Sequence, residues 1–316
     1  YRGNYAGAAM HLKAILDQVQ AAGGKDIRLL STTLNNLATA YQLQGNLAEA
    51  EALFKQSLEL RQKSLRPDDP QLAQAMHNLA ALYQIQERYP EAEKLYQQAL
   101  AIRQAILREN HYDTATTLSK LALVYHKQNK NAEAEALLKR SLTMREKWYG
   151  MNNPGLTPAL QDLGEFYALQ KRYDEAEPLL KRALSIAEKS WGREQPETAQ
   201  VLVSLGAMYR EQGKLPTAEP LLKQAADIVE KARGEDHPSL VPCLSALAKL
   251  YRAQGKATDA EPLYRRSLAI YEKHLAPTSP QLAKLIEDYA ALLRDLKRDG
   301  DAAKLEEKLK QPNNLK

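Results

Sequence analysis

A tyrosine recurs every 42 residues along this 316-residue chain, and that period constrains the fold more than any other feature. The tyrosine positions are Tyr41, Tyr83, Tyr125, Tyr167, Tyr209 and Tyr251, followed by Leu293. An alanine or glycine stands three residues before each of them, and an alanine stands nine residues after. Seven copies in one unbroken register predict a repeat architecture, in which each copy is one structural unit.

Each copy is expected to form two helices. In one copy, Leu72, Met76, Leu79 and Tyr83 are spaced so that they share one face of a helix. After a short turn, a second apolar stripe follows over about residues 91–108. Prolines in the longer connectors mark places where a helix is expected to stop or begin. No segment alternates polar and apolar residues with period two, so the sequence predicts no strand.

The alanine and glycine columns give the stacking of the copies a physical reason. Small side chains let a neighbouring helix approach to the short end of the roughly 8–10 Å range of helix packing. A single helix pair of 42 residues buries too little apolar surface to be stable alone. Stacking gains roughly 25 cal/mol for each Å² of apolar surface removed from water. The sequence therefore predicts an all-α solenoid in which each copy completes the core of its neighbour.

The same columns resemble the tetratricopeptide repeat, which has leucine, a small residue and tyrosine on its first helix and alanine, a bulky residue and a small residue on its second. That repeat usually has about 34 residues. The 42-residue unit, with "NNLA" at 35–38 and "GEDHP" at 234–238, is similar to the kinesin light chain subtype. The resemblance implies an all-α, right-handed superhelical solenoid of antiparallel helix pairs, with the first helices lining a concave groove. HEAT repeats have a similar period, but the fixed tyrosine and alanine columns argue against them.

The two ends of the chain are expected to differ from its middle. Residues 1–30 fit the second helix and connector of a truncated leading repeat, as in a piece of a longer protein or a processed product. Residues 31–316 then hold seven helix-pair repeats of about 42 residues. Glu306 stands where other copies have a bulky apolar residue, which predicts a polar, solvent-facing C-terminal cap.

Motifs for catalysis or cofactor binding are missing from the sequence. It has no H-E-x-x-H pattern, no glycine-rich phosphate loop and no G-x-S-x-G motif. Cys243 is the single cysteine, so neither an internal disulfide nor a zinc site built from several cysteines is possible. We therefore expect a non-catalytic protein with no cofactor, no metal and no small-molecule substrate. His237 lies in a connector, where turn formation is its expected role.

The charge balance does not indicate a nucleic acid as the partner. The net charge is only +5, and aromatic residues that could stack on bases make up 6% of the chain. No run of about eighteen apolar residues is present, so we expect no membrane span and a cytoplasmic location. Acid–base pairs four residues apart, such as Glu51 and Lys55, recur in register and are expected to stabilise helices while facing water.

The resemblance places the positions nine, six, five and two before the tyrosine, and one after it, on the concave wall. In the first two copies these inner positions are polar and uncharged. The predicted peptide-binding residues among them are Asn35, Asn36, Gln42, His77, Asn78 and Gln84. Because amide side chains both donate and accept hydrogen bonds, this stretch is expected to hold the backbone of an extended peptide whatever its side chains.

Further along the chain, basic residues occupy inner positions. Arg210, Arg252 and Arg294 form a predicted arginine ladder, and Lys249 lies on the same wall. A planar guanidinium can bind a carboxylate through two parallel hydrogen bonds, so the ladder is expected to select acidic side chains. The resemblance to kinesin light chain repeats likewise implies a peptide with acidic residues around an aromatic anchor. Acidic residues on this wall leave a second possibility open, pairing of the ladder within the chain. They are Glu165, Glu287 and Asp288.

The sequence therefore predicts a non-catalytic scaffold that binds an extended, acidic peptide segment of a partner protein in its concave groove. Two alternatives stay open. The chain could be the recognition or sensor segment of a larger multidomain signalling protein, or a self-assembly module that forms a homo-oligomer through an exposed N-terminal face. Its alanine- and glutamine-rich composition is typical of a bacterial protein.

Overall fold

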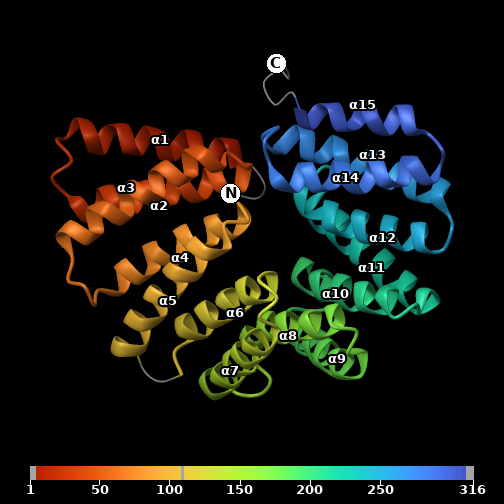
Figure 1. Ribbon diagram of the computed structural model, residues 1–316, viewed down its shortest axis with the longest axis horizontal. Coiled ribbons are helices and arrows are strands. Elements are labelled where there is room, and N and C mark those ends of the chain that lie inside the picture. The colour runs from red at the N-terminus through yellow and green to blue at the C-terminus, as the bar shows by residue number, and fades with distance from the viewer. Residues whose placement is uncertain (1–4, 108–109, 311–316) are drawn as a thin grey trace. The chain divides into compact units, whose positions relative to one another are not determined.

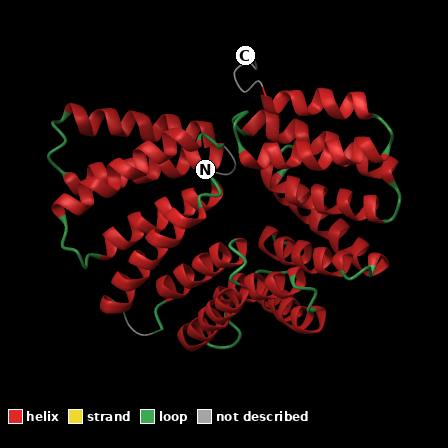
Figure 2. Cartoon of the chain, viewed as in Figure 1, coloured by secondary structure: helices red, strands yellow, loops and turns green. Residues whose placement is uncertain are grey.

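The computed structural model describes residues 5–107 and 110–310 and consists of helices joined by short turns (Figures 1 and 2). No strand occurs in these two ranges, so the predicted all-α fold is confirmed. The chain divides into two compact units, Tyr1–Trp148 and Tyr149–Lys316, which we call the N-terminal unit and the C-terminal unit. Each unit is a solenoid of helix pairs stacked in chain order.

In the N-terminal unit, helices that follow one another in the chain pack together. α2 packs on α3 and α4 on α5 as pairs, and the packing of α3 on α4 and of α5 on α6 joins one pair to the next. The helix α5 begins two residues before the predicted segment, with Pro90 in its first turn. The helices are α1 (Tyr5–Ala21), α2 (Ile27–Gln44), α3 (Leu47–Ser64), α4 (Pro70–Ile85), α5 (Tyr89–Ile106), α6 (Tyr112–Lys127) and α7 (Asn131–Tyr149).

The C-terminal unit follows the same plan, with two connectors folded into short 3₁₀ turns. Its elements are η1 (Pro154–Leu156), α8 (Thr157–Leu169), α9 (Tyr173–Ser190), α10 (Pro196–Glu211), α11 (Leu215–Arg233), η2 (Pro238–Leu240), α12 (Val241–Ala253), α13 (Ala257–His274), α14 (Pro280–Asp295) and α15 (Asp299–Lys310). The helix α10 packs on its pair partner α11 and also on α8 and α12. We call the first helix of each pair, which has an even number from α2 to α14, an A helix, and the second a B helix.

A tight turn joins the A and B helices of each repeat, and one of its residues has a positive φ, the region that glycine enters most easily. The residues in this position are Gly45, Glu87, Asn129, Lys171, Gly213, Gly255 and Lys297. The next residue donates its N–H to the carbonyl of the tyrosine position, at 2.9 Å from Asn46 to Tyr41. This bond satisfies a carbonyl group near the end of the A helix, so the tyrosine column also marks where each A helix stops.

In several of the longer connectors, one residue near the end caps the helical segment that follows. Asp69 accepts a hydrogen bond from the N–H of Gln71 at 2.7 Å, and His237 accepts one through Nδ1 from the N–H of Ser239 at 3.1 Å. These bonds satisfy N–H groups that the first turn of a helix leaves without a partner. The turn-forming role predicted for His237 is therefore confirmed.

The small residues lie where the helices approach one another most closely, as the columns predicted. Ala38 on α2 is fully buried. A Cβ atom added to Gly206 would lie 2.6 Å from Leu222, and one added to Gly164 would lie 2.8 Å from Leu180. Because these distances are shorter than van der Waals contact, glycine is what allows α10 to approach α11, and α8 to approach α9, this closely.

Candidate functional site

Three amide side chains form a line of hydrogen bonds across α2 and α4. Asn78 donates through Nδ2 to Oδ1 of Asn35 at 2.9 Å, and Gln74 donates through Nε2 to Oδ1 of Asn78 at 2.7 Å. Asn35 and Asn78 are half-buried, whereas Gln74 is exposed. The structure therefore brings two of the predicted peptide-binding residues together and adds Gln74 to them. We call these three residues the amide line.

The other predicted amides differ in whether their side chains form hydrogen bonds within the chain. Asn36 is exposed and Gln42 is half-buried, and neither side chain has a hydrogen-bond partner in the described part of the chain. Gln84 accepts a hydrogen bond through Oε1 from the hydroxyl of Tyr96 at 3.1 Å. The ring of Tyr96 is fully buried, so this bond fixes the Gln84 carbonyl while its amide group remains a donor.

His77 lies beside the amide line but belongs to a half-buried cluster. Its ring meets the ring of Tyr96 edge-on, with centroids 5.2 Å apart, and its Nδ1 lies 3.4 Å from the hydroxyl of Thr117. Burial, together with the positive charges of Arg103 and Lys120, lowers the pKa of His77 to about 3. The imidazole is therefore uncharged at neutral pH.

Arg103 is a buried cation held by uncharged acceptors. Only 4% of this residue is exposed. Its Nη1 donates to the carbonyl of Asp113 at 3.0 Å and to the hydroxyl of Thr117, and its Nη2 donates to Oε1 of Gln74 at 2.8 Å. Burial lowers the pKa of Arg103. The guanidinium thus connects the B helix α5, the next A helix α6 and the amide line.

Arg103 belongs to a column of buried arginines that was not among the predicted site residues. Arg61, Arg103 and Arg145 are spaced 42 residues apart and are all buried. Arg61 donates through Nη1 to the carbonyl of Gln71 at 2.7 Å, as Arg103 does to Asp113. The spacing alone could have revealed the column. The corresponding residues of the C-terminal unit are Ala187, Val229 and Tyr271.

The arginine ladder of the C-terminal unit is paired within the chain, which is the second possibility that the sequence left open. Arg210 lies 2.5 Å from Glu211 of its own helix. Arg252 on α12 pairs with Asp295 at the end of α14. Arg294 pairs through Nη2 with both carboxylate oxygens of Glu306 on α15. The two Arg294–Glu306 distances are 2.8 and 2.7 Å.

Other charged residues of this wall also form ion pairs or hydrogen bonds within the chain. Lys249 pairs with Asp288 at 2.7 Å, across α12 and α14. On α8, Glu165 accepts a hydrogen bond from the hydroxyl of Ser204 at 2.5 Å. Burial raises the pKa of Glu165 more than this hydrogen bond lowers it. In the C-terminal unit, then, the basic residues that were predicted to bind a peptide all have a carboxylate partner.

A pocket of about 320 Å³ lies between α10, α11 and α12. Val229 and Cys243 form buried parts of its wall, Val203 is half-buried, and Gln200 and Pro242 are exposed. Burial raises the pKa of Cys243 to about 12, so its thiol is uncharged at neutral pH. Sequence reasoning did not identify this α10–α12 pocket.

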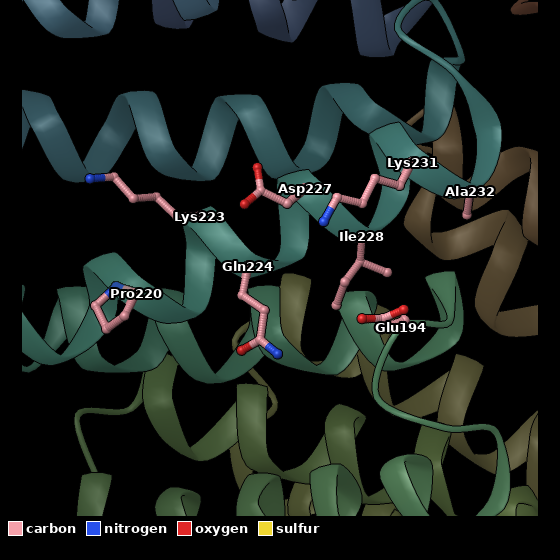
Figure 3. A pocket seen from close by; sticks show the side chains of 8 residues that line it. All are labelled: Glu194, Pro220, Lys223, Gln224, Asp227, Ile228, Lys231 and Ala232. Carbon is pink, nitrogen blue, oxygen red and sulfur yellow. The ribbon is translucent and has the colours of Figure 1, made fainter.

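A second pocket, of about 590 Å³, follows one face of the B helix α11 (Figure 3). Lys223, Asp227 and Lys231 line it from α11, and Glu194 lines it from the connector before α10. Charges of both signs occur around it, so no single ligand charge is favoured. Its residues lie outside the inner positions of the A helices.

The described ranges lack two further kinds of site. No group of three or more histidine, cysteine, aspartate or glutamate side chains within residues 5–107 and 110–310 is arranged to hold a metal ion. Every helix in the same ranges is too short or too polar to cross a lipid bilayer.

Comparison with known families matches nearly the whole chain to one model, described as the tetratricopeptide repeat. No curated protein sequence matches the chain. The residues matched to the family model are 1–63, 29–105, 71–147, 156–231, 197–273 and 244–309.

Solved structures with this fold include three of different origin. BtubC (BKLC) from P. vanneervenii is 24% identical, with a TM-score of 0.60 over 73% of this chain and 92% of that one. A putative kinesin light chain with nearly identical TPR-like repeats, from Podosopora anserina, is 28% identical, with a TM-score of 0.54 over 66% and 97%. The Rap conjugation gene regulator of the plasmid pLS20, in complex with the Phr* peptide, is 12% identical, with a TM-score of 0.66 over 93% and 78%.

Proposed function

Because the chain belongs to the tetratricopeptide repeat family, we propose that it is a non-catalytic scaffold that binds an extended peptide segment of a partner protein along the inner positions of its A helices. The pLS20 regulator, which shares the fold, was solved with a peptide bound. That likeness concerns the fold alone, so the proposal depends on the residues of this chain.

The amide line is the observation that supports the proposal most. Asn35 and Asn78 come from neighbouring A helices and are bonded to each other at 2.9 Å, and Asn36 and Gln42 lie at further inner positions of α2. An extended peptide presents one N–H and one C=O group per residue. Amide side chains can meet both kinds of group, so this surface fits a peptide backbone without requiring particular side chains.

Selection of acidic side chains is the second part of the proposal. Arg210, Arg252, Arg294 and Lys249 now pair with carboxylates of the chain itself. Arg252 and Arg294 are exposed, and exposed ion pairs contribute only about 0–1 kcal/mol, so a peptide carboxylate with bidentate geometry can replace the partners of these two arginines. Lys120, at an inner position of α6, has no ion-pair partner in the described chain and offers another basic group.

The experiment is a selection from a random peptide library against the whole chain, followed by titration of the selected peptides into variants. We expect Asn78→Ala to weaken binding about tenfold, because one hydrogen bond contributes about 0.5–1.5 kcal/mol and tenfold corresponds to about 1.4 kcal/mol. Asn152→Ala, in an exposed connector, is the matched control and should leave the affinity unchanged.

A different experimental result would contradict each part of the proposal. A library that yields no binder would overturn the peptide-binding function. Binders whose affinity is the same for the wild type and Asn78→Ala would remove the amide line from the site. For the acidic part, Arg252→Glu should weaken the selected acidic peptides at low salt and have less effect at high salt. An unchanged affinity at both salt concentrations would remove the arginine ladder.

A further inference from the structure

The α10–α12 pocket occupies a position that is filled by polar side chains in the N-terminal unit. Three repeats earlier, an imidazole, a guanidinium and a hydroxyl bond to one another between α4, α5 and α6. In the C-terminal unit two valines and a thiol stand in their places. The corresponding residues are His77 and Val203, Arg103 and Val229, and Thr117 and Cys243.

The absence of a guanidinium at Val229 explains why a pocket is present here. Arg103 reaches from α5 to the carbonyl of Asp113 at the start of α6, 3.0 Å away, and its side chain occupies the space between the two helices. Val229 starts from the same position on α11 but is several atoms shorter and makes no polar contact. The helices keep the same packing plan, so the space that a long side chain would fill becomes a pocket of about 320 Å³.

The wall of the pocket favours an apolar ligand. Val203, Val229 and Cys243 contribute two branched aliphatic groups and an uncharged thiol. At the rim, Glu197 and Arg233 lie 3.8 Å apart and largely cancel each other's charge. An apolar cavity of about 150 Å³ is large enough to hold benzene. The larger α10–α12 pocket, which opens to solvent, therefore has room for a ring or a branched aliphatic side chain.

The position of the pocket connects it with the peptide. Gln200 and Val203 lie nine and six residues before Tyr209, and Pro242 lies nine before Tyr251, so all three occupy inner positions. The pocket thus opens at the face of the A helices where the peptide is proposed to lie. The exposed amide of Gln200 at the rim corresponds to Gln74 of the amide line and can bond the peptide backbone next to the pocket.

We propose that the α10–α12 pocket receives an apolar side chain, up to the size of an aromatic ring, from the peptide bound along the A helices. This assignment rests on the proposed function and adds a specificity that the amide line cannot provide. Burying such a side chain removes apolar surface from water, whereas a polar or charged side chain would lose hydration without gaining a partner.

The first test uses a probe that does not depend on peptide binding. N-acetyl-phenylalanine amide is titrated into the whole chain while the methyl signals of Val203 and Val229 are followed by NMR. We expect saturable shifts of both residues, and no saturable shift with N-acetyl-serine amide. In a Val203→Phe variant the introduced ring fills the pocket, and the shift of Val229 should be lost.

The second test uses the peptides selected from the library. Val203→Phe should weaken them at least tenfold, whereas Ala253→Phe, at the exposed end of α12 and outside both the pocket and the inner positions, should not. Circular dichroism checks that the variants fold. Pro242→Phe, at the exposed rim, covers the pocket without altering the core and should give the same loss as Val203→Phe.

The outcomes separate the two proposals. If the phenylalanine probe shifts no pocket methyl group, or peptides bind equally to the wild type, Val203→Phe and Pro242→Phe, the pocket assignment is overturned and the peptide scaffold stands. If the probe binds in the pocket but the library yields no peptide, the scaffold function fails and so does the role of the pocket in it.

Discussion

Glu51 of α3 accepts hydrogen bonds from Nη1 of Arg88 through both carboxylate oxygens, each at 3.0 Å, and thereby joins one repeat to the next. The guanidinium of Arg88 also lies over the ring of Tyr83, 4.0 Å from its centroid. The predicted pair of Glu51 with Lys55 is present at 2.6 Å, and the prediction that the pair faces water is right for Lys55, whose side chain is 55% exposed, but wrong for Glu51, whose side chain is only 17% exposed. The Glu51 carboxylate instead links its own repeat to the next one through Arg88.

The Glu51–Arg88 junction predicts a loss of stability in acid. Burial raises the pKa of Glu51, but hydrogen bonds from Lys55, Gln86 and Arg88 outweigh this effect and lower it to about 2. The stabilisation is fully present above the unfolded pKa of about 4.5 and is lost as the pH falls toward 2. The free energy of unfolding of Glu51→Gln should be about 1–3 kcal/mol below that of the wild type at pH 7.

Urea unfolding of both proteins between pH 7 and pH 3 checks this prediction. The difference between wild type and Glu51→Gln should shrink as the pH is lowered through 4, and a constant difference would contradict it. Glu59→Gln is the matched control, since Glu59 pairs with Lys63 on the same helix but is 63% exposed, and it should change the stability little.

His77 predicts a second dependence of the unfolding free energy on pH, from a group that is positive rather than negative when charged. Its folded pKa of about 3 lies below the unfolded value of about 6.5, so between these values the unfolded chain binds a proton that the folded chain does not. Stability should therefore fall as the pH drops below about 6.5. The slope of unfolding free energy between pH 7.5 and pH 5 should be smaller in His77→Gln than in the wild type. Equal slopes would show that the His77 ring is not held neutral.

The close approach at Gly206 predicts that a single added methyl group is destabilising. The new Cβ would meet Leu222, a fully buried residue, at 2.6 Å, and overpacking of this kind typically costs about 1–3 kcal/mol. Gly206→Ala should lower the thermal midpoint despite the better helix propensity of alanine. Gly300→Ala, in a helix with open space around it, is the control and should raise the midpoint slightly. The same sign for both changes would contradict the prediction.

We expect removal of the Arg103 guanidinium to lower the stability of the fold more than removal of a surface charge does. Arg103→Met leaves the carbonyl of Asp113 and the amide of Gln74 without this donor, so we expect a loss of about 2–4 kcal/mol in denaturant unfolding. Arg66→Met, at a side chain that is 83% exposed, is the matched control and should have little effect. If Arg103→Met lowers the free energy of unfolding no more than Arg66→Met does, the buried hydrogen bonds of Arg103 do not stabilise the fold.

The fold was predictable because the signals that determine it repeat. Leucine, small residue and tyrosine recur at one spacing, so every copy reinforces the assignment of the same two helices. The left-handed turn residue was harder to foresee, since Glu87 and Lys171 occupy a position that is glycine in other copies, such as Gly45 and Gly213. At those two places the turn geometry is imposed by the packing of the helices and by the bond back to the tyrosine carbonyl.

The site was predictable only as a set of positions. Register placed Asn35 and Asn78 on neighbouring helices, but their mutual hydrogen bond depends on rotamers that a sequence does not specify. Pairing of the ladder within the chain was left open, but Asp295, the partner of Arg252, was not among the acidic residues considered, because it lies just outside the inner positions. The α10–α12 pocket was missed altogether, since a pocket is detected by what is absent, and Val229 looked like ordinary core.

The junction formed by Glu51 and Arg88 recurs further along the chain, for example between Glu261 and Arg298 at 2.9 Å. Such junctions lie one after another along the polypeptide, so a tension applied to the two ends passes through each of them in series. The force at which the molecule first extends would then be set by its weakest junction, and strengthening any other would leave that force unchanged.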